Sequence, residues 1–229
     1  NYIPYNKKNK GLETFLYQIM PKDNIRKYLM KLIASTLRFR KDNKFYIWTG
    51  HGGAGKSTLI NLIERSFGKY TFSFPITLLT QKRAASNSAT PELAKGKGKR
   101  FGSLNEPDDG DKLNVGLFKQ LSGGDNIECR RLFEDPIEYK PQYRLILLCN
   151  HLPVIGGKKT EDDSGIWRRI RVVNFGSKFV KNPKEANEFK LDECIDDKLD
   201  AWKEDFMGLI INYYKDYKKT GNDEPSEIL

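Results

Sequence analysis

The chain has 229 residues, of which 38% are hydrophobic, and its mean hydropathy is -0.64. These values are ordinary for a folded chain with a sizeable core, and they argue against a largely disordered protein. Lysine and arginine number 40 against 30 aspartates and glutamates, a net charge of +10 that slightly favours a polyanionic partner such as nucleic acid. No apolar run is long enough to cross a bilayer, so we expect no membrane partner.

The three cysteines, Cys129, Cys149 and Cys194, are odd in number, and no two of them form a close pair in the sequence. This pattern argues against a disulfide framework and against a zinc site, and it predicts a reducing, intracellular compartment. The two histidines are too few for a histidine-based metal centre. Asn1 stands in place of an initiator methionine and no secretory signal follows, so we expect a fragment of a longer protein.

Residues 1–44 are predicted to form a helical segment. Apolar side chains recur at helical spacing before Pro21, namely Leu12, Phe15, Leu16 and Ile19. Asp23 is then placed to cap a second helix, whose apolar positions run from Ile25 to Leu37.

Residues 45–176 are predicted to form an α/β core. Phe45–Thr49 is a short aromatic and β-branched strand, and a glycine-rich turn leads from it into a helix over about Lys56–Phe67. Three more strands are predicted, over Arg100–Asn105, Tyr143–Cys149 and Ile170–Phe175. The continuous apolar run Leu145–Leu148 is typical of a strand that is buried on both faces. Such strands favour a central, mostly parallel sheet with helices on its faces.

Residues 177–229 are predicted to form a second helical segment. Its apolar residues step by three or four positions and Gly221 is placed to stop the helix, the positions being Leu199, Trp202, Phe206, Ile210, Tyr213 and Tyr217. We interpret this stripe as a packed lid or bundle helix rather than as a partner-binding face.

The strongest motif is the turn Gly50–Ser57, which fits the P-loop pattern G-x-x-x-x-G-K-[ST] at every fixed position. The glycines allow backbone N–H groups to point at phosphate oxygens, and the following helix directs its positive end at the same group. Lys56 is predicted to reach the β and γ phosphates of ATP, and Ser57 to bind Mg²⁺. A strand before the motif and a helix after it make a chance match improbable. The predicted phosphate-binding residues are Gly50, Gly52, Gly53, Ala54, Gly55, Lys56, Ser57 and Thr58.

Two polar residues follow predicted strands. Hydrolysis needs an acid at the end of a strand near the P-loop, and Glu106 occupies such a position after Arg100–Asn105. Asn150 follows the strand that ends at Cys149, where its amide could bind water or the γ-phosphate or could simply begin a loop. The alternative to the catalytic role is that Glu106 is a surface acid beside a turn.

Further motifs stand in order along the chain. Lys119–Asp125 has the sequence KQLSGGD, and KPQ, CNHLP and WRRI follow at Lys140–Gln142, Cys149–Pro153 and Trp167–Ile170. Together with the P-loop, this series resembles the superfamily 3 helicases, specifically the primase–helicase type of large DNA viruses (poxvirus-like), phages and plasmids. The resemblance covers about residues 45–175 and is far more specific than the P-loop alone.

The resemblance implies an AAA+-like fold, a hexameric ring and ATP-driven translocation along single-stranded or forked DNA during replication, in the host cytoplasm or at a viral replication site. It implies that Glu106 is the catalytic acid and Asn150 a sensor of the γ-phosphate. It further implies that Arg169, or Arg168 beside it, is an arginine finger, which could stabilise charge on ATP held by a neighbouring subunit. The full-length protein is expected to carry a primase domain, as members of the family often do.

One residue departs from the family pattern. Asn105 replaces the first of two acids that often end this strand, so Mg²⁺ is expected on Ser57 and the phosphates, with Glu106 and Asn105 acting through water molecules.

A hairpin is predicted over residues 127–141, in which Cys129–Pro136 turns between two short strands. The resemblance implies that it contacts DNA independently of base sequence. The predicted DNA-binding residues are Lys119, Arg130, Arg131, Phe133 and Lys140. Alternatively, Phe133 belongs to the core and the arginines are solvated. The lysines and arginine of residues 95–100 line a subunit interface or decorate a loop.

Two rival functions stay open at this point. One is an RNA helicase of the same superfamily, although the motif series fits the DNA branch better. The other is a nucleotide-dependent switch or structural ATPase without unwinding, which would lack a working nucleic-acid hairpin.

Overall fold

The computed structural model describes residues 9–38, 42–81, 88–108, 111–156 and 164–228. Contacts divide the chain into two compact units, each assembled from separate stretches. The first, here called the helical unit, comprises Asn1–Arg38, Thr49–Gly68 and Val173–Leu229, and the second, the sheet unit, comprises Phe39–Trp48 and Lys69–Val172. This division differs from the three consecutive segments of the sequence analysis, because it groups the P-loop and its helix with the two terminal segments.

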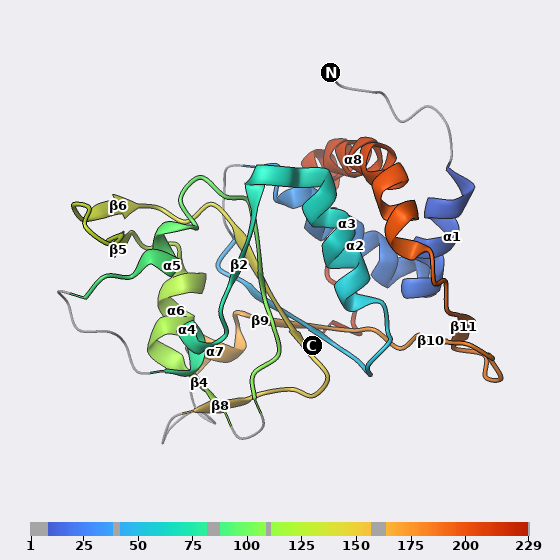
Figure 1. The fold of residues 1–229 in the computed structure, drawn as a ribbon, viewed down its shortest axis with the longest axis horizontal. Coiled ribbons are helices and arrows are strands. Elements are labelled where there is room, and N and C mark those ends of the chain that lie inside the picture. Colours follow the sequence, from blue (N-terminus) through green and yellow to red (C-terminus); the bar gives the residue numbers. More distant parts are fainter. Residues whose placement is uncertain (1–8, 39–41, 82–87, 109–110, 157–163, 229) are drawn as a thin grey trace. The chain divides into compact units, whose positions relative to one another are not determined.

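In its described residues, the helical unit contains four helices, α1 (Lys10–Ile19), α2 (Asp23–Ser35), α3 (Lys56–Phe67) and α8 (Ile195–Thr220) (Figure 1). A 3₁₀ turn at Gly68–Tyr70 lies where the chain enters the sheet unit. The buried face of α1 consists of the four apolar residues that the periodicity identified. Its N-cap is Asn9, whose side chain accepts a hydrogen bond from the N–H of Leu12 at 3.1 Å. The prediction that Asp23 caps α2 is wrong, because Asp23 is the first helical residue and pairs instead with Arg26 and Lys27.

The long helix α8 packs against both α2 and α3. Leu199, Phe206 and Ile210 are buried on its inner face, and the helix ends where the N–H of Gly221 donates to the carbonyl of Tyr217 at 2.8 Å. Before α8, the short strands β10 (Lys178–Val180) and β11 (Glu188–Lys190) pair in parallel, an element that the sequence analysis did not predict.

The sheet unit is built on a five-stranded sheet in the order β2-β3-β7-β1-β9. The strands are β2 (Thr71–Phe74), β3 (Phe101–Leu104), β7 (Arg144–Cys149), β1 (Phe45–Thr49) and β9 (Ile170–Asn174), of which β1 and β9 run on into the helical unit. Strand β3 pairs in parallel with both β2 and β7, and every residue of β3 and β7 is buried. The predicted α/β fold with a central, mostly parallel sheet is thereby confirmed.

Short elements complete the sheet unit. They are α4 (Thr77–Thr80), α5 (Pro91–Ala94), β4 (Lys112–Asn114), α6 (Val115–Gly123), β5 (Ile127–Cys129), β6 (Ile137–Tyr139), β8 (Val154–Gly156) and α7 (Ser164–Trp167). Helix α6 begins at Asn114, whose side chain accepts from the N–H groups of Gly116 and Leu117. Its Phe118 packs on Phe45 of β1 with ring centroids 4.7 Å apart.

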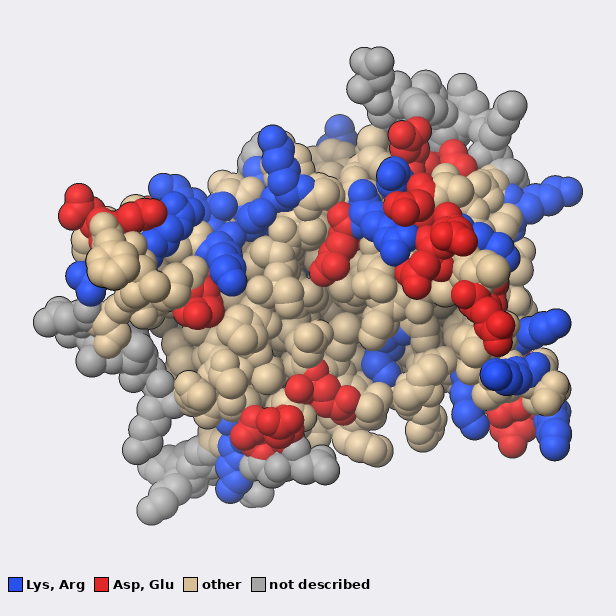
Figure 2. Space-filling model, in the orientation of Figure 1, with Lys and Arg blue, Asp and Glu red and all other residues tan. Residues whose placement is uncertain are grey.

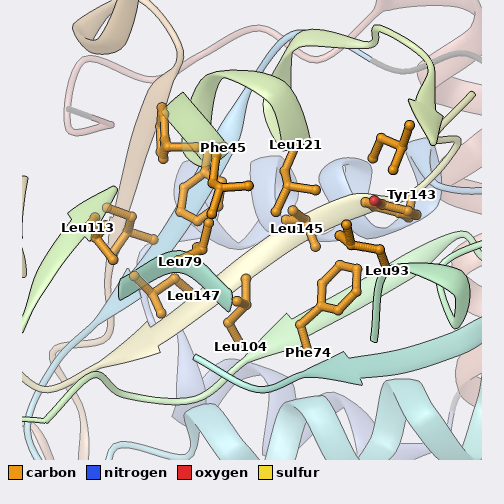
Figure 3. Packing of buried hydrophobic residues seen from close by; sticks show 14 of the residues in the cluster. Phe45, Phe74, Leu79, Leu93, Leu104, Leu113, Leu121, Tyr143, Leu145 and Leu147 are labelled. Atoms are coloured by element: carbon orange, nitrogen blue, oxygen red, sulfur yellow. The ribbon is translucent and has the colours of Figure 1, made fainter. Parts of the chain in front are cut away.

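The core of the sheet unit lies between the sheet and these short helices (Figure 3). Leu145 and Leu147 of β7 and Leu104 of β3 are essentially fully buried there, together with Leu121 of α6 and Leu79 of α4. Burial on this scale stabilises by roughly 1.5–3 kcal/mol for each large apolar side chain. It fixes where β3 and β7 end, and therefore where the polar residues after them lie.

Candidate functional site

The P-loop has a backbone that only glycine can follow at certain positions. Gly50 has a φ of 146°, and a Cβ added there would lie 2.3 Å from the carbonyl oxygen of Phe175. Gly53 and Gly55 are left-handed, with φ of 76° and 83°. The glycine pattern of the motif thus reflects real conformational demands of the turn between β1 and α3.

The ammonium group of Lys56 lies inside the turn that the P-loop forms. Lys56 is 8% exposed, and its ammonium donates to the carbonyls of Gly50 and His51. Ser57 is exposed in the first turn of α3. The N–H of Phe179 on β10 donates a hydrogen bond of 2.9 Å to the carbonyl of Gly53. An ammonium, an exposed hydroxyl and the N-terminus of a helix converge here, which is the donor set that a polyphosphate with a magnesium ion requires.

A cavity of about 930 Å³ adjoins the P-loop within the helical unit and shares Gly53, Gly55 and Thr58 with it. Its walls are formed by α1, by β10 and the residues around β11, and by the start of α8. The lining includes aromatic rings and polar groups that could receive a nucleoside, namely Phe15, Phe179 and Trp202 with Thr14 and Gln18. Sequence analysis missed this cavity, although Phe15 and Trp202 belong to the apolar stripes that it identified.

Several lysines also line the cavity, and two of them have acidic partners. Lys198 pairs with Asp192, and Lys181 lies 3.9 Å from Glu193. Lys10 and Lys190 contribute two further ammonium groups to the wall. The lining therefore combines three aromatic rings with four lysines and two acids, which suits an anionic ligand that carries a flat ring.

In the sheet unit, the structure brings together the two strand-end residues that the sequence analysis selected. One carboxylate oxygen of Glu106 accepts from the backbone N–H of Asn150 at 2.5 Å, and the other accepts from its side-chain amide at 2.7 Å. Both residues are exposed. They meet because β3 and β7 are parallel neighbours, so their carboxyl ends share one edge of the sheet. The result is an oriented, solvent-accessible carboxylate.

The two candidate arginine fingers have different surroundings. Arg169 is half-buried, and its guanidinium donates to the carbonyl of Lys119 on α6 at 3.0 Å. It lines a pocket of about 420 Å³ together with Lys119 and Asp125. Arg168 is exposed. Arg169 thus ties the turn between α7 and β9 to α6 inside the sheet unit, whereas Arg168 presents its guanidinium to solvent.

The predicted hairpin is present, as β5 and β6 pair antiparallel with Ile127 opposite Tyr139 and Cys129 opposite Ile137. Phe133 at its tip is 103% exposed and has a φ of 60°, a strained conformation for a bulky side chain. The alternative that Phe133 belongs to the core is therefore wrong.

The other predicted DNA-binding residues lie around this hairpin and on α6. Arg131 is exposed and pairs with Glu134 at 3.3 Å, while Arg130 is half-buried. Lys140, which directly follows β6, is exposed, and Lys119 on α6 is half-buried.

The base of the hairpin is held by buried groups with a structural role. The hydroxyl of Tyr139 donates to the carbonyl of Leu93 at 2.6 Å, and burial raises the pKa of Tyr139 to about 12. Burial also raises the pKa of the Cys129 thiol. Among the residues that the structure describes, no three His, Cys, Asp or Glu side chains are grouped so as to hold a metal ion.

Residues 48–169 match the model of DUF5906, a family of unknown function. The chain belongs to this family. It is 38% identical to "Putative helicase L207/L206" of Acanthamoeba polyphaga mimivirus, over 96% of this chain and 24% of that protein. It is 31% identical to "Putative helicase 022R" of Frog virus 3, over 74% of this chain and 18% of the relative. It is 25% identical to "Putative primase C962R" of African swine fever virus, over 84% of this chain and 20% of that protein.

These relatives confirm the predicted resemblance of this DUF5906 chain to primase–helicase proteins of large DNA viruses. The chain spans between about a fifth and a quarter of their length. Solved structures of the NrS-1 C-terminal region have the same fold, one with a TM-score of 0.69 at 14% identity over 97% of this chain and 53% of that one. In the described part of the DUF5906 chain, no helix is both long and apolar enough to span a bilayer.

Proposed function

We propose that this DUF5906 chain is the ATP-hydrolysing motor of a DNA helicase that acts in viral replication. The observation that carries the proposal is the P-loop, with its constrained glycines and enclosed Lys56, beside a cavity of nucleoside-accepting character. The names of the viral relatives support a role in replication. One of them is named a primase, so we further propose that a priming domain accompanies the motor in the full-length protein.

In this proposal the helical unit holds the nucleotide. The N–H groups of the P-loop and the ammonium of Lys56 bind the phosphates, and the hydroxyl of Ser57 is a ligand for Mg²⁺, which neutralises charge on the β and γ phosphates. The base and ribose enter the adjoining cavity, where Phe179 offers an aromatic face and Gln18 an amide for hydrogen bonding.

The sheet unit is proposed to supply the acid chemistry. Glu106 orients the attacking water and contributes to Mg²⁺ binding, while Asn150 holds the carboxylate in place and responds to the γ-phosphate. Two hydrogen bonds from Asn150 limit the rotation of the carboxylate, so little reorganisation is needed when the water is activated.

Hydrolysis is proposed to occur between subunits of a hexameric ring, with Arg168 as the arginine finger. Arg168 is exposed, whereas Arg169 donates to the carbonyl of Lys119 in its own subunit. Because the guanidinium of Arg169 is engaged by α6 within its own subunit, we assign Arg169 a positioning role for the residue before it.

DNA is proposed to pass along the β5–β6 hairpin, with the exposed ring of Phe133 stacked on a base or sugar. No group on the hairpin matches a base-reading pattern, so binding is proposed to be independent of sequence. The protein would act in infected cells at the site of viral replication.

The proposal is tested by measuring ATP hydrolysis and particle mass with the chain extended to the length of its relatives. We expect hydrolysis that single-stranded DNA stimulates, a particle of six subunits in ATP and DNA, and displacement of a strand from a forked duplex. Phe133→Ala should weaken DNA binding by about 1–3 kcal/mol and abolish strand displacement while leaving basal hydrolysis intact. Hydrolysis without strand displacement by the wild-type protein would favour the rival switch ATPase. Absence of ATP binding would end the proposal.

A further inference from the structure

The β5–β6 hairpin is poorly charged for a phosphate-binding element. Residues 127–139 contain two arginines and four acids. Two of those acids, Glu128 and Glu138, are exposed and directly opposite each other in the register of the hairpin. A third, Glu134, pairs with Arg131. The outer face of the hairpin therefore repels a nucleic-acid backbone, because like charges that face each other add their fields.

The segment that follows α5 has the opposite charge. Residues 95–100 contain Lys95, Lys97, Lys99 and Arg100 and no acid. Lys99 and Arg100 are half-buried and donate to the carbonyl of Lys69 and the side chain of Gln142. Lys95 and Lys97, by contrast, are exposed. We call these two residues the lysine ridge.

Packing fixes the lysine ridge to the base of the hairpin. Gly96, between the two lysines, is buried, and a Cβ added there would lie 2.6 Å from the hydroxyl of Tyr139 and 2.7 Å from the ring of Tyr143. Close to the ridge, Thr90 and Arg130 exchange two hydrogen bonds of 2.8 and 3.2 Å. The segment is thus packed against the hairpin rather than free in solvent, and its charges keep a defined position beside the hairpin.

The charge of Lys97 also acts on β5, the first strand of the hairpin. Lys97 and Arg131 are both close enough to Cys129 of β5 to stabilise its thiolate, against the dominant effect of burial, which raises the pKa of that thiol. Figure 2 shows lysine and arginine side chains gathered beside the hairpin and acidic side chains at its outer end. The lysine ridge thus lies beside the base of the hairpin, whereas Glu134 and Asp135 belong to the turn that joins its two strands.

We propose that the lysine ridge is a second nucleic-acid contact, which binds phosphates of a single DNA strand whose base or sugar meets Phe133, while Glu128 and Glu138 keep the strand off the opposite face. The inference rests on the proposed function, since it concerns the strand on which the motor acts. It assigns a path to that strand: past Lys95 and Lys97 beside the base of the hairpin, and away from Glu128 and Glu138. Phosphate contacts position the strand without reading its sequence.

The experiment measures equilibrium binding of a fluorescent oligothymidylate to the full chain at several salt concentrations. Each lysine that neutralises a phosphate of a single strand adds about 0.7 to the salt slope, so Lys95→Gln with Lys97→Gln should lower the slope by about 1.4. The matched control, Lys215→Gln with Lys219→Gln, removes the same charge from exposed positions of α8 and should leave the slope unchanged. Equal slopes for the wild type and the ridge variant would overturn the inference.

A second variant tests the acidic face. Glu128→Gln with Glu138→Gln removes the facing acids without changing side-chain size, and it should raise the affinity for the oligonucleotide severalfold at low salt. Unchanged or lower affinity, in a variant whose melting curve matches the wild type, would contradict the path. The proposed function and the lysine ridge can fail separately. If the wild-type protein binds no DNA, the proposed function is wrong. If Phe133→Ala weakens DNA binding but Lys95→Gln with Lys97→Gln does not, only the lysine ridge is wrong.

Discussion

The P-loop of the helical unit and the Glu106–Asn150 pair of the sheet unit are built in different ways. The P-loop is one continuous stretch, Gly50–Ser57, whose function depends on its own backbone conformation. Glu106 and Asn150 are 44 positions apart, and they meet because two parallel strands end at the same edge of a sheet. The P-loop is therefore sensitive to substitutions that change backbone angles, whereas the acid–amide pair is sensitive to anything that shifts the register of β3 against β7.

The arginines after α7 belong with the second type of site. Neither Arg168 nor Arg169 can be assigned a role from its own sequence context, because the two are adjacent and chemically identical. The two differ in the structure because the guanidinium of Arg169 donates a hydrogen bond to a carbonyl of α6, whereas Arg168 is exposed. A residue's role in such a site depends on a partner far away in the chain.

The largest effect is expected from the exposed arginine. Arg168→Ala should lower ATP hydrolysis by about a thousandfold while ATP still binds, because an arginine finger supplies stabilisation of this order in the transition state. Arg169→Ala should instead lower the melting temperature, since a half-buried hydrogen-bonding partner of α6 is lost at a cost of about 1–3 kcal/mol. Steady-state phosphate release and thermal unfolding separate the two effects.

Mixing subunits decides whether the finger acts across an interface. Rings that combine Arg168→Ala subunits with Lys56→Ala subunits contain some interfaces with an intact P-loop on one side and an intact Arg168 on the other. We expect such mixtures to regain hydrolysis that neither variant has alone. Failure to regain activity in mixtures that still form rings would show that Arg168 does not act between subunits.

The next effect concerns the ammonium of the P-loop. Lys56→Ala should reduce hydrolysis by roughly 100- to 1,000-fold, since it removes the cation aimed at the charge that develops on the phosphates. Lys215→Ala, an exposed lysine in the same unit, is the matched control and should retain full activity. Normal turnover by Lys56→Ala would refute the assignment of the site. Phosphate release over a range of ATP concentrations measures the hydrolysis rates of both variants.

A comparable but smaller effect is expected in the sheet unit. Glu106→Gln keeps the size of the side chain and removes the negative charge, so hydrolysis should fall by roughly 100-fold while ATP affinity is preserved. Asp108→Asn, which alters another exposed acid two residues later, should be nearly silent. Equal loss in both variants would mean that local charge, rather than the Glu106–Asn150 pair, determines the rate.

The smallest effect is a difference in stability between substitutions at two of the four P-loop glycines. Gly50→Ala forces a Cβ to within 2.3 Å of the carbonyl oxygen of Phe175 at a φ of 146°, and should destabilise the fold by about 1–3 kcal/mol. A Cβ at Gly52 would meet nothing within 4 Å, so Gly52→Ala should change stability by no more than about 0.5 kcal/mol. Urea unfolding of both variants measures the difference, and equal midpoints would contradict the strained geometry at Gly50.

Several features of the site could be predicted from the sequence because the signal lies in neighbouring residues. The P-loop, the strand before it and the helix after it follow from glycine spacing and local periodicity, and Glu106 and Asn150 were found because each comes after a predicted strand. The cavity beside the P-loop was missed because its lining comes from α1, the P-loop, β10, the residues around β11 and α8, which share no sequence pattern. The fixed position of Lys95 and Lys97 was missed for a similar reason, since it depends on the packing of Gly96 against Tyr139 and Tyr143.

The sequence by itself determined the fold class, the phosphate-binding turn and the residues that end β3 and β7, because these depend on spacing and on apolar runs within single elements. Tertiary structure alone decided that Glu106 is held by Asn150, that Arg169 is engaged by α6 while Arg168 is exposed, and that Glu128 faces Glu138 across the hairpin. These facts depend on which distant segments become neighbours. Burial of the core and strand register determine those neighbours, and neither is encoded in any one stretch of the chain.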